Sequence, residues 1–306
     1  MINRRTTLKL GAALLAAPAL LRAQEPEFPT LIQKPIPASG ELLPVIGMGT
    51  SQTFDVPASE ATIDQLAKVM AAFFSAGGKV IDSSPMYGEA EARVGDVLRR
   101  LSPRPPVFAA TKVWTEGKEA GEAQIEASAK RMDVAPLDLV AVHNLMDWKN
   151  HFSTLRQWKE EGKVRYYGIT TSHGRFHHEL LKIMRSEPLD FVQFSYNIAD
   201  REAEAQMLPL AQERGIATMI NRPFQRGELF TATRGKPLPE IAGEVGCSSW
   251  GQFFLKFIAS HPAVTCVIPA TSKPQHMIDN MGAIAGVLPD ADQRAAMLQA
   301  FKAAAG

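Results

Sequence analysis

Short apolar runs alternate with amphipathic segments along most of this chain, and this alternation limits the possible folds more than any other feature. The apolar runs predict strands at residues 45–49, 79–83, 107–113, 137–143, 164–170, 191–196, 217–221 and 264–269. They are apolar throughout, which is typical of a parallel sheet that is covered on both faces. Eight strand–helix units without a long break predict an α/β fold, a (β/α)8 TIM barrel.

The segments between these strands carry helical spacing and helix-end signals. Apolar residues recur at helical intervals from Ile63 to Phe74, Ser59 can cap this helix, and Gly77-Gly78 ends it. Residues 31–44 contain a Ser39-Gly40 turn and predict a small β-hairpin before the barrel. Further helices are expected at residues 89–101, 119–132, 152–161, 175–186, 207–214 and 248–260, with two extra C-terminal helices at 274–285 and 290–304.

A doubly wound open sheet is the alternative fold. The strand count argues against it, as does the absence of a G-x-G-x-x-G turn after the first strand. With 45% hydrophobic residues, the chain can form one large core, and we expect residues 31–306 to be a single barrel domain.

The first residues predict an export signal, not a part of the fold. Arg4-Arg5 precedes the apolar stretch Leu10–Leu21, which is shorter than the ~20 residues of a spanning helix. We therefore expect a signal peptide at residues 1–23, a linker at 24–30 and no stable membrane span. The alternatives to a cleaved signal peptide are an uncleaved anchor and a fortuitous pair of arginines.

The paired arginines resemble a twin-arginine signal, in which Leu8 and Lys9 also fit. This resemblance implies a partnership with the twin-arginine export machinery and a periplasmic or otherwise exported location. Cleavage is expected near Ala23, and cleavage after Ala19 is the other option.

Charge and cysteine content narrow the possible partners. The chain has 33 Lys+Arg against 32 Asp+Glu without a basic block, so nucleic acid is not an expected partner, and we expect a monomer. An exported protein could pair Cys247 with Cys266. Cys266 lies in an expected buried strand, which favours two free buried thiols.

Three successive strands end at ionisable residues. Asp82, Lys112 and His143 end the second, third and fourth strands, and Tyr87 follows Asp82 by five positions. The carboxyl ends of barrel strands converge on one face, so these four side chains should meet there. Singly, each residue could be a turn former, a solvated strand end, a packed aromatic or a core histidine. Together they predict a proton-donating site.

The chemistry of these side chains suits carbonyl reduction. A phenol has an unperturbed pKa of about 10, and a nearby ammonium such as Lys112 lowers it. Asp82 could hold the Lys112 amine, and His143 could orient a substrate oxygen. Such a group can protonate a carbonyl oxygen while a hydride reaches the carbon. The hydride requires a nicotinamide cofactor.

The chain resembles the aldo-keto reductase family in the segments Ile81–Glu91, Thr111-Lys112, Val142-His143 and Ile268–Pro274. The resemblance extends over about residues 31–300. It implies NADPH-dependent reduction of an aldehyde or ketone and a hairpin that covers the bottom of the barrel. The implied catalytic residues are Tyr87 as the acid, Asp82 and Lys112 as its tuning pair, and His143 as the orienting group.

The resemblance also implies a set of cofactor-binding residues, beginning at the end of the first strand. Gln193 matches a carboxamide-contacting glutamine, and Phe224 or Arg222 could stack on the nicotinamide. Lys273 favours NADPH over NADH. The full set is Gly49, Thr50, Thr170, Thr171, Gln193, Arg222, Pro223, Phe224, Gly227, Thr271, Ser272, Lys273, His276, Asp279 and Asn280.

Some of these positions depart from the family pattern. Thr170 and Thr171 replace a usual Ser-Asn pair. His276 stands where relatives often carry arginine, which forks onto phosphate oxygens better than a neutral histidine does. Asp279 and Asn280 match the positions that contact adenine.

The sequence gives few indications of which substrate the protein would select. Residues that follow strand ends and could line an apolar substrate pocket are Phe54, Met86, Trp114, Asn144 and Trp148. Two other functions are compatible with the fold: a nucleotide-binding sensor or accessory subunit, and a metal-dependent hydrolase. His173, His177 and His178 cluster in sequence, but they follow a single strand, so no metal site is expected.

Overall fold

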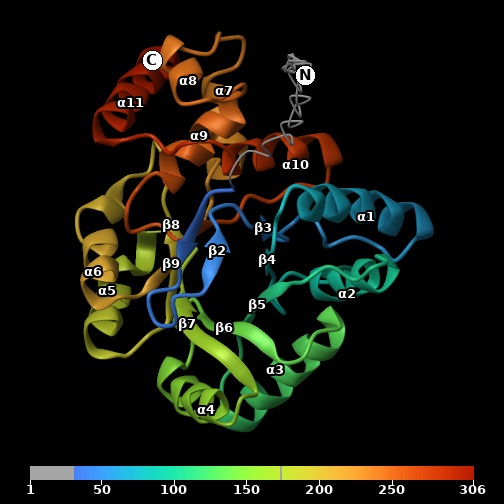
Figure 1. Cartoon of the computed structure of the whole chain (residues 1–306). Coiled ribbons are helices and arrows are strands. Elements are labelled where there is room, and N and C mark those ends of the chain that lie inside the picture. Colours follow the sequence, from blue (N-terminus) through green and yellow to red (C-terminus); the bar gives the residue numbers. More distant parts are fainter. Residues whose placement is uncertain (1–30, 173) are drawn as a thin grey trace, which may run out of the picture. The chain divides into compact units, whose positions relative to one another are not determined.

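The computed structural model describes residues 31–172 and 174–306. The predicted export signal and linker therefore lie outside the described residues. Eight parallel strands form one sheet in sequence order, with helices on its outer side (Figure 1). The strands are β3 (Met48–Gly49), β4 (Val80–Asp82), β5 (Phe108–Val113), β6 (Leu137–His143), β7 (Val164–Thr170), β8 (Phe191–Ser195), β9 (Ala217–Asn221) and β10 (Cys266–Val267).

The sheet closes on itself. Parallel bridges join Ile46 to Val267 and Gly49 to Ala270, and the Gly47 N–H donates to the Val267 carbonyl at 2.8 Å. The first and last strands are thus neighbours. The predicted (β/α)8 barrel is confirmed, and the open doubly wound sheet is excluded.

Most helices lie where the periodicity predicts them. Helices α1 to α6 and α9 follow the strands, and α10 and α11 are the extra C-terminal pair. Ser59 caps α1 by accepting from the Thr62 N–H at 3.2 Å. The bounds are α1 (Glu60–Ser75), α2 (Ala90–Arg100), α3 (Lys118–Met132), α4 (Trp148–Glu160), α5 (His177–Ser186), α6 (Met207–Arg214), α9 (Trp250–Ala259), α10 (Pro274–Met281) and α11 (Ala291–Ala305).

Some helices differ from the predictions. Helix α4 begins at Trp148, before the predicted Phe152, directly after a residue in the left-handed conformation, Asp147. Helix α10 ends at Met281, and a 3₁₀ turn over Gly282–Ile284 follows it. Two short helices that were not predicted, α7 (Glu228–Ala232) and α8 (Glu240–Glu244), lie between β9 and α9.

The predicted hairpin closes the bottom of the barrel. Strands β1 (Gln33–Pro35) and β2 (Leu42–Pro44) pair antiparallel. Ile36 and Leu43 are fully buried, in a cluster with side chains from the barrel interior that include Phe108. Because this end is filled, a ligand can enter from the carboxyl ends of the strands.

Two further observations concern the cysteines and the membrane-spanning potential of the described helices. Cys247 and Cys266 are both free and buried, so they do not form a disulfide. Within 31–172 and 174–306, no helix has both the length and the apolar character to cross a membrane.

Candidate active site

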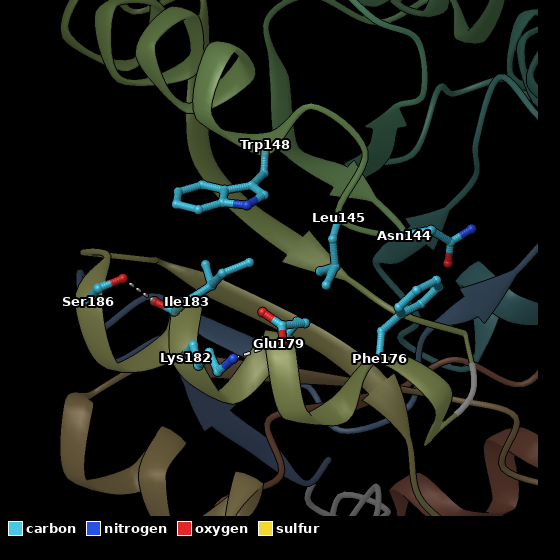
Figure 2. Close-up of a pocket in the computed structure, with 8 residues that line it drawn as sticks. All are labelled: Asn144, Leu145, Trp148, Phe176, Glu179, Lys182, Ile183 and Ser186. Atoms are coloured by element: carbon cyan, nitrogen blue, oxygen red, sulfur yellow. Dashed lines mark hydrogen bonds and ion pairs between the residues drawn. The ribbon is translucent and has the colours of Figure 1, made fainter.

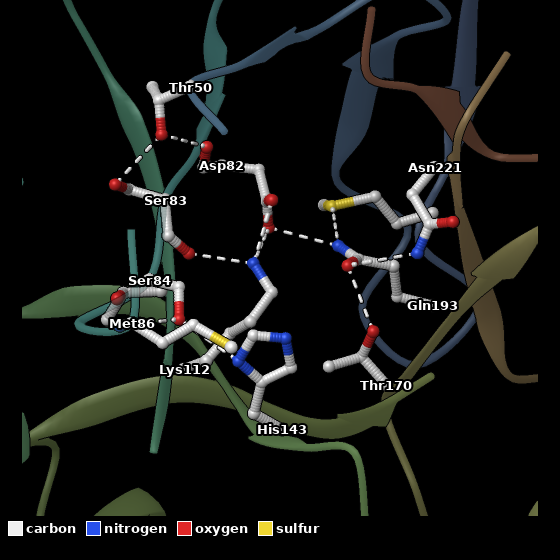
Figure 3. A network of polar contacts seen from close by, with 12 residues as sticks. Thr50, Asp82, Ser83, Ser84, Met86, Lys112, His143, Thr170, Gln193 and Asn221 are labelled. Carbon is white, nitrogen blue, oxygen red and sulfur yellow. Dashed lines mark hydrogen bonds and ion pairs between the residues drawn. The ribbon is translucent and has the colours of Figure 1, made fainter. Parts of the chain in front are cut away.

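The centre of the site is a buried ion pair between β4 and β5. Lys112 is fully buried, and its Nζ donates to both Asp82 carboxylate oxygens at 2.8 Å and to the Ser83 carbonyl at 2.7 Å (Figure 3). Burial lowers the pKa of the Lys112 ammonium, but Asp82, Tyr87 and Glu91 together outweigh burial and raise that pKa above its usual value. The ammonium therefore keeps its charge beneath the cavity floor.

Tyr87 lies directly above this ammonium. The Lys112 Nζ is 5.2 Å from the centroid of the Tyr87 ring, so the predicted phenol–ammonium contact is present. Burial raises the pKa of the phenol, and the lowering by Lys112 does not cancel it, so the net pKa lies above the usual 10. The predicted lowering of the phenol pKa by Lys112 is present, but desolvation, which the sequence does not reveal, is the larger effect. A raised pKa keeps the phenol protonated near neutrality, as a proton donor requires.

His143 completes the group from the end of β6. Its ring centroid is 5.9 Å from that of Tyr87, and the two planes are nearly perpendicular. Burial, assisted by the Lys112 charge, lowers the pKa of His143 to about 3. The imidazole is therefore neutral near pH 7 and can donate a single hydrogen bond.

A cavity of about 1070 Å³ opens above these residues. Drug-sized ligands occupy pockets of roughly 300–1,000 Å³, so this one has room for a dinucleotide with a small substrate. It brings together most of the predicted site residues, which are Gly49, Thr50, Asp82, Met86, Tyr87, His143, Asn144, Thr170, Gln193, Arg222, Pro223, Phe224, Gly227, Thr271, His276, Asp279 and Asn280.

The wall between β7 and β9 is polar. Gln193 donates from Nε2 to Asp82 Oδ1 at 3.0 Å, and its Oε1 accepts from the Thr170 hydroxyl at 2.9 Å. Asn221 donates to the Thr171 carbonyl at 2.9 Å. Asn221 Oδ1 and Thr171 Oγ1 are buried without a partner among the described residues. Asn221 lines the cavity, so its spare Oδ1 acceptor fits the amide donor of a nicotinamide carboxamide.

Asn221 was not among the predicted site residues. The signal that would have found it is the one that found Lys112 and His143, a polar residue at the carboxyl end of an apolar strand. Thr170 and Thr171 do lie at this wall, although Thr171 does not reach the cavity surface.

Positive charge gathers at the loop after β9. Arg222 and Arg226 both line the cavity, and the carboxylates of Asp200 and Glu228 attract Arg222 electrostatically. Burial and the charge of Arg226 lower the pKa of Arg222. Gly227, at φ +95°, has open space beside its Cα. Two guanidinium groups beside an open glycine fit a pyrophosphate.

Only some of the residues predicted to bind the adenosine end of the cofactor line the cavity. His276 lines the cavity, whereas Ser272 and Lys273 are exposed and do not line it. Asp279 accepts from the Ser249 hydroxyl at 2.7 Å and from Gln252 Nε2 at 3.0 Å. The roles of these residues in binding adenosine stay predictions.

The predicted substrate residues divide between two cavities. Met86 and Asn144 line the large one, while Phe54 is fully buried in the core and does not, which corrects that prediction. Trp114 lies 6.5 Å from the His143 ring but lines neither cavity. Trp148 and Asn144 line a second cavity of about 550 Å³ between α4 and α5 (Figure 2).

Asp55 supports the loop that carries Tyr87. Its Oδ1 accepts from the Glu89 N–H at 3.0 Å, and it lines the large cavity. Gly88 has φ +55°, and a Cβ there would lie 2.2 Å from Asp55 Oδ1. The carboxylate therefore packs directly against Gly88, next to the phenol. No sequence motif pointed to Asp55.

We expect Gly88→Ala to reduce kcat and lower the melting temperature, because the added Cβ displaces either Asp55 or the Tyr87 loop. Gly162→Ala is the matched control, since Gly162 also has a positive φ, +73°, but has open space around it. That control should cost only about 1–2 kcal/mol of unfolding free energy and leave kcat unchanged. Thermal unfolding and steady-state kinetics check both. Equal effects of the two variants on kcat would contradict the contact with Asp55.

The described residues contain no group of three or more His, Cys, Asp or Glu side chains arranged to hold a metal ion. His173 lies outside these residues, whereas His177 begins α5. The described part of the chain thus offers no support for the metal-dependent hydrolase.

Comparisons with known proteins agree with this geometry. Residues 45–298 match the model of the aldo/keto reductase family. The methylglyoxal reductase YeaE of Escherichia coli is 28% identical over 273 residues, which cover 85% of this chain and 92% of that protein. An NADH-specific methylglyoxal reductase of the same organism is 28% identical over 189 residues, covering 51% and 55%.

A solved structure of an aldo/keto reductase from Klebsiella pneumoniae, in complex with NADP and acetate, shares the fold. Its TM-score is 0.72 at 24% identity, with 86% of this chain and 93% of that chain covered. The shared fold and the family match over most of the barrel together assign the chain to one family. The chain belongs to the aldo/keto reductase family and is an NAD(P)H-dependent carbonyl oxidoreductase.

Proposed function

We propose that this protein reduces an aldehyde or ketone to an alcohol with NADPH, and that Tyr87 is the general acid. The observation that carries the proposal is the close approach of three groups at the cavity floor. The Lys112 ammonium lies 5.2 Å from the Tyr87 ring centroid, and the His143 ring centroid lies 5.9 Å from the same centroid.

Each side chain has a distinct task in this scheme. The bound nicotinamide supplies a hydride to the carbonyl carbon. Tyr87 donates its phenolic proton to the carbonyl oxygen, so that the C=O bond becomes an alcohol C–OH. Lys112 stabilises the phenolate that Tyr87 becomes, because its charge is held beneath the ring by Asp82. A neutral His143 donates a hydrogen bond that orients the same oxygen.

The choice of NADPH over NADH rests on charge near the adenosine end. His276 lines the cavity, Lys273 is the residue before α10, and the helix N-terminus itself favours an anion. The Klebsiella structure was solved with NADP, whereas one E. coli relative is described as NADH-specific. We therefore expect these groups to bind the 2′-phosphate and to give a modest preference for NADPH over NADH.

We expect His276→Arg to tighten NADPH binding relative to NADH by about fivefold, because an exposed guanidinium gains a modest charged hydrogen bond to the phosphate. Gln275→Arg is the control, since it adds the same charge to α10 at a residue that does not line the cavity. Fluorescence titration with both nucleotides measures the ratio. An unchanged ratio in His276→Arg would remove this residue from the phosphate site.

Small carbonyl compounds are the substrates that we would test first. The E. coli relative that matches over most of its length is named a methylglyoxal reductase, and the cavity has both polar and aromatic walls. The alternative, a nucleotide-binding sensor, has no need for a buried ammonium beneath a phenol. The test is a titration of the purified protein with NADPH, followed by a panel of methylglyoxal and neutral aldehydes. Nucleotide binding without carbonyl-dependent oxidation would favour the sensor.

We further propose that the protein is exported by the twin-arginine route, cleaved near Ala23 and active in the periplasm. Arg4-Arg5 and the apolar stretch Leu10–Leu21 support this proposal. Replacing both arginines with lysine should retain the precursor in the cytoplasm, while replacing Arg22 with lysine should not. Fractionation and mass spectrometry of the mature N-terminus give the readout. Export of the twin-lysine variant would contradict the route.

A further inference from the structure

We infer that Ser84 is a positioning residue that holds His143 in the tautomer whose Nε2 carries the proton. The inference rests on the proposed carbonyl reduction, because it assigns which ring nitrogen faces the substrate oxygen. It concerns a serine that neither the sequence motifs nor the comparisons assign to any role.

The geometry around the Ser84 hydroxyl is specific. Ser84 is fully buried, and its Oγ lies 3.1 Å from His143 Nδ1 (Figure 3). The same Oγ accepts a hydrogen bond from the Met86 N–H at 3.3 Å. The backbone of Ser84 is also engaged, because its carbonyl accepts from the Tyr87 N–H at 3.0 Å.

These contacts determine the direction of the Ser84–His143 bond. The Met86 N–H already gives Ser84 Oγ a donor, and the serine needs an acceptor for its own proton. Within the described part of the chain, His143 Nδ1 is the one acceptor that the hydroxyl reaches. Ser84 therefore donates to Nδ1, which must carry the lone pair. A neutral imidazole has one N–H, so the proton lies on Nε2.

The opposite tautomer would be unfavourable for two reasons. With the proton on Nδ1, the buried Ser84 hydroxyl would lose its acceptor, which a buried polar group tolerates poorly. The Nε2 lone pair would then be the atom presented to the cavity that His143 lines. A lone pair there would repel a carbonyl oxygen, whereas an N–H attracts it.

Ser84 thus contacts both residues that we propose as hydrogen-bond donors to the substrate, Tyr87 and His143. Its side chain sets the proton on His143, and its carbonyl anchors the backbone of Tyr87. Both the phenol and the imidazole N–H are therefore positioned from one residue of the loop after β4.

The test is the tautomer of His143, measured by long-range ¹H–¹⁵N correlation in protein labelled at histidine. In the wild type we expect protonated Nε2 and unprotonated Nδ1, with no titration between about pH 5 and 8. Ser84→Ala should give a mixture of tautomers and lower kcat/KM about three- to tenfold, the value of one neutral hydrogen bond. Its affinity for NADPH should not change.

Two further variants keep the result interpretable. Ser84→Cys preserves the size with a weaker donor and should give intermediate values of both quantities. Ser83→Ala removes a neighbouring buried hydroxyl that contacts Thr50, and it should keep the wild-type tautomer. A wild-type proton on Nδ1, or an unchanged tautomer and kcat/KM in Ser84→Ala, would overturn the inference. Wild-type protein with the expected tautomer that reduces no carbonyl would instead refute the proposed function.

Discussion

Tyr87→Phe is expected to lower kcat for carbonyl reduction by about 10²–10⁴-fold, which is the usual contribution of a positioned general acid. The substitution removes the phenolic proton but keeps the ring above the Lys112 ammonium. The polar cavity wall formed by Gln193 and Asn221, which we propose holds the nicotinamide, is untouched, so the dissociation constant for NADPH should barely change. Fluorescence titration and steady-state kinetics on the same preparation give the two numbers.

Tyr167→Phe is the matched control for this variant. Its hydroxyl donates to the Pro188 carbonyl at 2.7 Å, away from the cavity, so the loss of that hydroxyl should leave kcat unchanged. Wild-type activity in Tyr87→Phe would reject the phenol as the proton donor. A parallel loss of NADPH binding would show that the ring, not the proton, is what the site needs.

Lys112→Met is expected to abolish most activity and to lower the free energy of unfolding by about 3–5 kcal/mol. The second effect arises because Asp82 is left as a buried charge without a counterion. The first arises because the ammonium is what lowers the phenol pKa against the effect of burial. Without it that pKa rises further, so any residual activity should show its alkaline limb at higher pH. Chemical denaturation and a pH–rate profile measure these changes.

A double variant separates the two effects. Asp82→Asn in the Lys112→Met background removes the uncompensated carboxylate, so much of the lost stability should return. Activity should not return, because the positive field beneath Tyr87 is still missing. Recovery of activity in the double variant would show that the field is dispensable. Unchanged stability in Lys112→Met would contradict the burial of the ion pair.

The convergence of the central residues was predictable because barrel geometry follows from strand order alone. Asp82 pairs in register with Ala110, and Lys112 pairs with Ala141, so each strand end adjoins the next. His143 in turn pairs with Thr170. Polar residues at the ends of successive apolar strands must therefore share one rim, whatever the loops between them do.

Properties that depend on packing were not predictable in this way. The net direction of the Tyr87 pKa is set by burial, which no local pattern states. Phe54 follows a strand end as a pocket residue would, yet it turns into the core while its neighbour Asp55 lines the cavity. The choice between such neighbours depends on the closing loops, whose contacts are long-range.

The loop after β9 could not be predicted from the sequence for a different reason. Helices α7 and α8 are only five residues each, too short for a clear hydrophobic period. Residues Arg222, Gln225 and Arg226 take positive φ values that are uncommon for side chains of this kind. Neither the short helices nor the positive φ values have a sequence signal, although this loop forms part of the cavity wall.

The most direct test of carbonyl reduction uses NADPH that carries deuterium at the transferable position of the nicotinamide ring. Wild-type protein is incubated with this nucleotide and with methylglyoxal or a neutral aldehyde, and the product is examined by mass spectrometry. We expect one deuterium on the alcohol carbon and a solvent-exchangeable proton on the oxygen, at one alcohol for each NADPH oxidised. NADPH that is bound but not consumed, or an alcohol without deuterium, would contradict the account.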